Sequence, residues 1–180
     1  MVRARRWLAR PLTRDARFRK VLCALTGLPV AWLVYVANLW LWHLPVLYDL
    51  AIEHEALHIV EHAAFFATSI LFGWPIVRPA PRLRPRAHAG FEILYLVAAT
   101  AQNTALGVLL SLPERSFYPH YDRVAARVGV SALDEQALAG GIMWANGHMY
   151  LLPILVILYD LARRSALEDD DELPELGARP

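Results

Sequence analysis

The sequence predicts an all-α integral membrane protein, folded as a bundle of about four transmembrane helices. Hydrophobic residues make up 57% of the chain and charged residues only 19%, and the charges are grouped in a few blocks. Four apolar windows of about 20 residues lie between these blocks, each long enough to cross a hydrocarbon layer of ~30 Å. A soluble helical protein would need polar helix faces, and these windows contain only isolated polar positions. The four helices are expected at about 21–42, 46–77, 88–112 and 134–163.

The distribution of basic residues predicts how these helices are oriented. The segment 1–20 contains eight basic residues and one acidic residue, the segment 43–55 contains neither Lys nor Arg, and the segment 78–88 carries four arginines. Basic residues remain on the cytoplasmic side of a membrane. We therefore expect a multi-pass protein of a prokaryotic plasma membrane, with both termini in the cytoplasm and the segments 43–55 and 113–135 outside.

Three parts of the chain are expected: a basic cytoplasmic N-terminal segment over 1–20, a membrane helical domain over 21–165, and an acidic, disordered tail over 166–180. The first apolar segment is longer than a signal-peptide core and has no small-residue cleavage pattern behind it, so it is expected to be a retained anchor. Cys23 is the single cysteine, which excludes a disulfide within one chain. The lipid bilayer is an expected partner, and nucleic acid is not.

Three histidines spaced by four residues, His54, His58 and His62, mark the outer start of the second helix. On an α-helix this spacing places them on one face, and Glu55 and Glu61 fall within the same arc of roughly 120°. Ionisable groups at the membrane boundary are costly and are usually kept for function. The alternative is that the histidines reach toward the interface or form hydrogen bonds between helices.

Two histidines four residues apart can bind one metal ion, because their side chains project from the same face one turn apart. The third cannot join them on a straight helix, since a rise of about 12 Å separates His54 from His62. One ion is therefore expected on His58 together with either His54 or His62. The remaining ligands must come from elsewhere, and the candidates are His43, His120, Glu55, Glu61, Met143 and His148.

The types of ligand limit which metal ions are candidates, but they do not identify one. Imidazole suits zinc, copper, nickel and iron, the thioether of Met143 favours reduced copper, and carboxylates fit iron or zinc. Glu61, three residues after His58, can instead orient an imidazole by accepting a hydrogen bond from its second nitrogen.

The other polar and small positions within the helices predict packing. Gln102 and Asn103 are expected to form hydrogen bonds to neighbouring helices. On the fourth helix Gln136, Gly140, Met143 and Gly147 share a face, and small residues on such a face let another backbone approach closely.

A series of motifs in fixed order extends through the helices and their outer connections. It begins with Leu41-Trp42-His43-Leu44-Pro45 and Leu47-Tyr48-Asp49, followed by His54, His58, Glu61 and His62. It continues with Gly73-Trp74-Pro75, Gln102-Asn103 with Gly107, Tyr118-Pro119 with Tyr121, and Asp134-Glu135-Gln136 with Gly140, Met143 and Trp144. Over residues from about 20 to 165 this pattern resembles the CtaG-type (caa3-type) cytochrome c oxidase assembly factors.

The resemblance implies an integral membrane chaperone rather than an enzyme. It would help to mature the copper-containing catalytic subunit of a haem-copper oxidase, handling copper on the outer side of the membrane, where histidines one turn apart could pass an ion along a helix face. Members of the family usually have additional membrane helices upstream, so the chain is expected to be a short form or to have a misplaced start.

Two other functions are compatible with the same residues. A haem-binding electron carrier would use histidines on facing helices as axial ligands, and a membrane redox protein with a di-iron site would use His58, His62 and Glu61 with ligands from other helices. A pure interaction scaffold would need none of the histidines. The sequence leaves open the identity and oxidation state of the metal, and also homo-oligomerisation.

Overall fold

The computed structural model describes residues 16–79 and 83–176, and over these ranges the chain is helical and contains no strand. Its elements are α2 (Ala16–Leu25), α3 (Leu28–Trp42), α4 (Pro45–Glu53), α5 (Glu55–Val77), α6 (Ala89–Ser111), α7 (Pro119–Val128), α8 (Ala132–Gly147), the 3-10 turn η1 (His148–Tyr150) and α9 (Leu151–Leu176). The predicted all-α class is therefore confirmed. Residues 1–15 of the expected basic segment and 177–180 of the expected tail lie outside the described residues.

Three helical segments are long and apolar enough to cross a membrane: Glu55–Val77, Ala89–Ser111 and Ala132–Arg164. A fourth is obtained if α2 and α3, which meet at an angle of 70°, form one broken span. The bend follows from the local sequence, because Gly27 adopts an extended backbone conformation and Pro29 lies in the first turn of α3. The expected helix 21–42 is thus bent rather than straight.

The expected helix 46–77 is wrong in one respect, because the chain forms two helices there. His54 has an extended backbone, with φ −125° and ψ 106°, and separates α4 from α5. Its amide donates to the Leu50 carbonyl, which closes α4, and its own carbonyl accepts from Leu57 and His58, which starts α5. Only α5 has the length of a membrane span.

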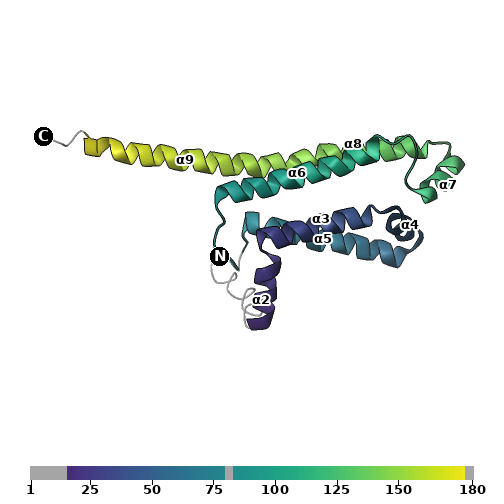
Figure 1. Cartoon of the computed structure of the whole chain (residues 1–180), viewed down its shortest axis with the longest axis horizontal. Helices are drawn as coiled ribbons and strands as arrows, with labels where there is room; N and C mark the ends of the chain where they lie inside the picture. Colours follow the sequence, from purple (N-terminus) through teal and green to yellow (C-terminus); the bar gives the residue numbers. More distant parts are fainter. Residues whose placement is uncertain (1–15, 80–82, 177–180) are drawn as a thin grey trace.

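The helices form two layers (Figure 1). Helices α3 and α5 lie side by side in one layer, and α6 lies along α8 and the first part of α9 in the other. The short helices α4 and α7 gather at one end of the molecule, whereas α2 and the connection into α6 lie toward the opposite end. We refer to these as the α4–α7 end and the Arg-rich end, since the second carries Arg78, Arg84 and Arg86.

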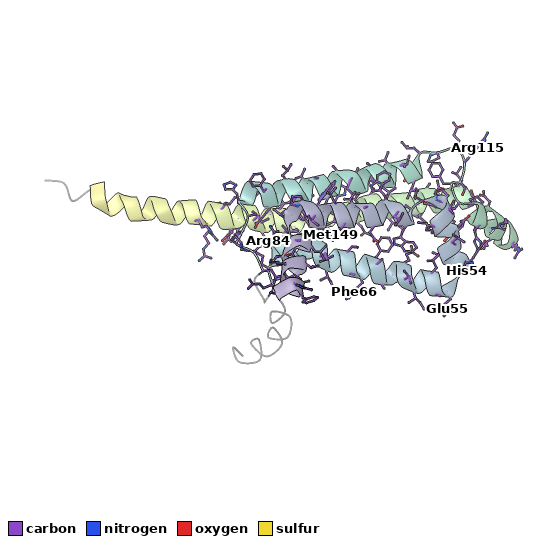
Figure 2. All side chains as sticks on the ribbon, turned by 60° about the horizontal axis from the view of Figure 1, so that its bottom comes forward. His54, Glu55, Phe66, Arg84, Arg115 and Met149 are labelled. Atoms are coloured by element: carbon purple, nitrogen blue, oxygen red, sulfur yellow. The ribbon has the colours of Figure 1, made fainter. Side chains whose placement is uncertain are left out.

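Two clusters of buried side chains join the layers. One contains Phe72, Tyr95, Leu96, Ala99, Ile154 and Ile157, and the other contains Leu39, Leu106, Leu110 and Tyr118. Large apolar side chains also cover the outside of the helices, and Phe66 on α5 is 70% exposed and points away from the bundle (Figure 2). Apolar side chains both inside and outside are what a lipid environment requires.

Glycines bring α6 and α8 into close contact, as the small-residue face of the fourth helix predicts. A Cβ atom placed on Gly107 would lie 2.8 Å from the Gly140 carbonyl oxygen, and one on Gly140 would lie 2.6 Å from the Gly107 carbonyl oxygen. A Cβ on Gly147 would lie 2.8 Å from the Asn103 side-chain nitrogen. No larger residue fits at the crossing of these two helices without displacing their backbones.

Side-chain amides form hydrogen bonds across the same interfaces, which confirms their predicted packing role. Asn103 donates to the Met143 carbonyl at 2.7 Å, and Gln102 accepts from the Trp40 indole at 3.1 Å. Gln136 donates to the Leu110 carbonyl at 2.9 Å and accepts from the Phe117 amide at 2.7 Å. The amides therefore tie α6 to both α3 and α8.

Helix α9 continues through residues 166–176, where the sequence predicts a disordered tail. Ala, Leu and Glu, which make up much of this stretch, all have high helix propensity. The helix extends beyond the rest of the bundle (Figure 1).

Candidate metal-binding site

His58 and His62 form the closest pair among the predicted ligands. They lie one turn apart on α5 and both are exposed, with their Nε2 atoms 2.8 Å apart and their ring centroids 4.6 Å apart. In the neutral state one Nε2–H donates to the other Nε2. Of the two pairings that the spacing allows, the structure therefore favours His58 with His62.

The geometry of this pair can accept a metal ion after a small movement. A tetrahedral ion bound at ~2.0–2.1 Å to each nitrogen would separate the two nitrogens by roughly 3.3 Å. The observed 2.8 Å between the Nε2 atoms would have to increase by roughly half an ångström. Exposed side chains can make such a change by rotation, because no packed neighbours hold them in place.

His54 takes no part in this pair. It occupies the junction of α4 and α5, where its extended backbone removes it from the helical register that the sequence predicts. His54 and Glu55 lie at the α4–α7 end of the molecule (Figure 2), and both are exposed.

His43 follows α3 and has one ring nitrogen available for a ligand. Its Nδ1 lies 2.7 Å from the Leu39 carbonyl oxygen, and because a carbonyl only accepts, Nδ1 carries the proton of the neutral ring. The lone pair of Nε2 is then free. Burial lowers the pKa of His43 below its ordinary value, although the hydrogen bond to Leu39 and the charge of Glu61 both act to raise it. A neutral imidazole is the form that binds metals.

Glu61 is half-buried, and its charge acts on side chains that precede α5. It partly opposes the burial that lowers the pKa of His43, and it contributes to the raised pKa of Tyr48, whose main cause is burial, followed by a hydrogen bond with Tyr121. The Glu61 carboxylate is therefore close enough to His43 and Tyr48 for its charge to affect both.

His43 and Met143 line one cavity of about 530 Å³ at the α4–α7 half of the bundle. Its walls come from the helices α3 to α8 and from η1, and they include Tyr48, Asn103 and Glu135. An imidazole and a thioether, both predicted as ligands, thus line the same cavity.

His120 is held elsewhere, by acidic residues of α4. Its Nδ1 lies 3.1 Å from the Glu53 carboxylate, and its backbone amide donates to Asp49 at 3.2 Å. Glu53 also accepts from Arg123 at 3.1 Å. These contacts support a structural role for His120, which attaches α7 to α4.

Within residues 16–79 and 83–176, no group of three or more His, Cys, Asp or Glu side chains is arranged to hold a metal ion. The predicted ligands instead form two separate sets, the exposed pair His58–His62 and the cavity with His43 and Met143. His148, the remaining candidate, begins η1, and its ring interacts with the Trp144 carbonyl at the end of α8.

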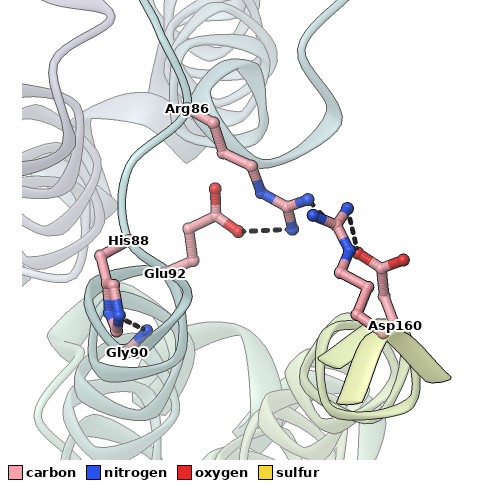
Figure 3. Close-up of polar contacts among 6 residues, drawn as sticks. Arg86, His88, Gly90, Glu92 and Asp160 are labelled. Carbon is pink, nitrogen blue, oxygen red and sulfur yellow. Dashed lines mark hydrogen bonds and ion pairs between the residues drawn. The ribbon is translucent and has the colours of Figure 1, made fainter. Parts of the chain in front are cut away.

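Sequence reasoning missed two features. One is the pair Asp49 and Glu53, whose spacing of four residues on α4 already indicates a common face toward α7. The other is Glu92, an acid inside the third apolar window, which is 2% exposed and forms an ion pair with Arg86 at 3.2 Å (Figure 3). An ionisable residue in an apolar window is the signal that could have identified it.

These observations define the class of the protein: a helical protein whose apolar helices fit several crossings of a membrane, with an exposed histidine pair on one of them. The family model described as cytochrome c oxidase caa3 assembly factor matches residues 1–164, and the chain belongs to this family. No curated protein and no solved structure matches the chain.

Proposed function

We propose that this chain takes up copper at its histidines and passes it to the catalytic subunit of a cytochrome c oxidase, acting as a chaperone rather than as an enzyme. Membership of the assembly-factor family supplies the oxidase partner. The observation that carries the copper role is the exposed His58–His62 pair, whose Nε2 atoms are 2.8 Å apart.

A site made of two imidazoles suits the transfer of a copper ion better than its storage. Two protein ligands leave an ion coordinatively incomplete, so that a partner protein can supply the remaining ligands and take the ion away. Because both rings are exposed, a partner can reach them directly. The cavity with His43 and Met143 offers a second station, where a thioether favours reduced copper.

The proposal places these histidines on the outer side of a prokaryotic plasma membrane and both termini in the cytoplasm. The positive-inside pattern of the sequence supports this orientation. The fold is compatible with it, since α4 and α7, which belong to the two expected outer segments, lie at the same end of the molecule (Figure 1).

Copper binding by the purified full-length chain in detergent tests the proposal. We expect His58→Ala/His62→Ala to weaken the affinity by on the order of tenfold or more, since even the loss of groups that support a metal ligand costs ~10–100-fold. His88→Ala/His148→Ala is the matched control, because the contacts described for these two histidines are with sequence neighbours, Gly90 and Phe91 for His88 and Trp144 for His148. Equal copper affinity in both double variants would contradict the proposal.

Absorption spectra and metal analysis of the same preparation test the two redox functions, and oxidase maturation tests the scaffold. A haem absorption band would favour an electron carrier, and two iron ions per chain would favour a di-iron redox protein. An oxidase that still matures when all three of His54, His58 and His62 are replaced would favour a scaffold.

A further inference from the structure

A second cavity, of about 300 Å³, lies at the Arg-rich end, and its lining contains neither His58 nor His62. It is enclosed by the α2–α3 junction, the end of α5 and the connection into α6, and it is lined by Arg78, Arg84 and Arg86. Its lining residues in the described part of the chain include no Asp or Glu. Arg78 and Arg84 therefore bring positive charge to this cavity, whereas Arg86 is paired with two acids outside its lining.

Two of the three arginines are fixed by contacts behind the cavity. Arg86 lies between Glu92, at 3.2 Å, and Asp160, at 3.4 Å (Figure 3). Arg84 donates from Nε to the Cys23 carbonyl at 2.5 Å, and its guanidinium group lies over Gly27, where a Cβ atom would come within 3.3 Å of Cζ. Both cations are thus held in place before any ligand arrives.

Arg78 is different, because its Nε is buried and has no hydrogen-bond partner among the described residues. It follows Val77, the last residue of the α5 span, in a left-handed backbone conformation with φ 49°. A buried donor without an acceptor is costly. Rotation of the Arg78 side chain toward the cavity would let an anion there supply that acceptor.

An apolar groove of about 540 Å³ continues from this cavity along the outside of the bundle. The two share Leu28 and Pro29, and the groove then runs between α3 and α6 past Trp32, Leu33, Phe91 and Leu94. Leu33, Phe91 and Leu94 are 59%, 64% and 61% exposed. The indole N–H of Trp32, in the wall of the groove, is a second buried donor that lacks a partner within the described residues.

We propose that the cavity and the groove together bind one anionic glycerophospholipid, with its phosphate among the arginines and one acyl chain in the groove. Arginine forms strong, charge-assisted hydrogen bonds with phosphate oxygens. The cavity lies where the spans α5 and α6 end and begin, which is the level at which headgroups lie. The apolar continuation favours a lipid over a free phosphate ion. This site is independent of the proposed copper role.

Lipid retention by the full-length chain, measured by native mass spectrometry from detergent, tests the proposal. The probes are phosphatidylglycerol and phosphatidylcholine with the same two oleoyl chains. We expect the wild-type chain to retain phosphatidylglycerol preferentially, and Arg78→Gln/Arg84→Gln to weaken that retention at least about fivefold, as expected for the loss of basic residues near a lipid headgroup. Arg86 is left intact, because removing it would leave Glu92 buried without its ion pair.

The matched control is Arg115→Gln/Arg127→Gln, which makes the same charge change on exposed residues away from the cavity and should retain phosphatidylglycerol like the wild type. Ala98→Phe fills the groove without changing charge and should also weaken retention, whether or not the arginine variant folds. Equal retention of both lipids by the wild type would overturn the proposal. So would displacement of phosphatidylglycerol by inorganic phosphate at equal concentration, because it would show an anion site without a chain-binding groove.

Discussion

The Glu53 carboxylate lies 3.1 Å from the His120 ring and 3.1 Å from the Arg123 guanidinium, and these contacts attach α7 to α4. They connect the two segments that the sequence places outside the membrane. Helix α7 also contributes Tyr121 to the wall of the His43–Met143 cavity, so these contacts help to position that wall.

The first prediction concerns the stability of this attachment at acidic pH. The hydrogen bond from His120, together with the charges of His120 and Arg123, holds the pKa of Glu53 below its ordinary value of 4.5. A carboxyl whose pKa is lower in the folded chain stabilises the fold at pH values above its ordinary pKa. That stabilisation is lost as the pH falls below 4.5 and through the lowered folded-state pKa.

We therefore expect Glu53→Gln to have a lower melting temperature than the wild type at pH 7 in detergent. The difference should shrink as the pH falls below 4.5, where the wild type loses the same charge. Glu114→Gln, a change at another acid of the same end for which no ion pair is described, is the control and should melt like the wild type at every pH. A constant difference between Glu53→Gln and wild type down to pH 2 would show that the ionised carboxylate is not what matters.

The second prediction concerns the crossing of α6 and α8. Gly107→Ala would place its Cβ 2.8 Å from the Gly140 carbonyl oxygen and 3.0 Å from the Trp144 amide nitrogen, both of them backbone atoms that cannot rotate away. Overpacking of this kind costs about 1–3 kcal/mol. Gly141→Ala is the matched control, since a Cβ there meets nothing within 4 Å. Unfolding followed by far-ultraviolet circular dichroism should rank the control at or above wild type, and equal loss in both variants would contradict the close packing.

Hydropathy predicts the membrane helices well and their interruptions poorly. The windows 88–112 and 134–163 agree closely with Ala89–Ser111 and the span Ala132–Arg164, because long apolar segments are determined by composition alone. The break at His54 lacks such a signal. It accompanies the contacts of α4 with α7, which join residues about 70 positions apart in the chain and cannot be read from local sequence.

The site residues also differ in whether their contacts follow from local sequence or from packing between helices. The contact of His58 with His62 could be predicted, because it depends only on helical spacing. The positions of His43, Met143 and His120 depend on which helices pack together, and a single sequence contains no direct record of that. The groove formed by Gly140 and Gly147 was predictable as a surface, but only the structure identifies α6 as the helix that fills it.

The third prediction concerns the buried carboxylate at the Arg-rich end. The Glu92 side chain is 3% exposed, and one of its oxygens has no hydrogen-bond partner among the described residues, so Arg86 is the partner that compensates its charge. Removing one member of a buried ion pair typically costs about 3–5 kcal/mol. We expect Arg86→Gln to destabilise the chain by an amount in this range.

The comparison for that prediction is Asp160→Asn, which removes the other acid that contacts Arg86. The Asp160 side chain is 38% exposed, and surface ion pairs contribute only about 0–1 kcal/mol. Denaturant unfolding in detergent should therefore separate the two variants clearly. Similar free energies of unfolding for both would contradict the view that Arg86 stabilises the fold by compensating the buried Glu92 carboxylate.

The last prediction concerns the second copper station and rests on the proposed function. Met143→Leu keeps the volume of the side chain and the backbone carbonyl that accepts from Asn103, so the packing of α6 on α8 should persist. It removes the thioether, the ligand that distinguishes reduced from oxidised copper. We expect the affinity for Cu(I) to fall severalfold while the affinity for Cu(II) changes little, measured by competition with a chromophoric chelator. Ile142→Leu, a change at the adjacent residue lining the same cavity, should leave both affinities unchanged. If Met143→Leu weakens both oxidation states equally, the effect comes from the shape of the cavity, and the thioether is not a ligand.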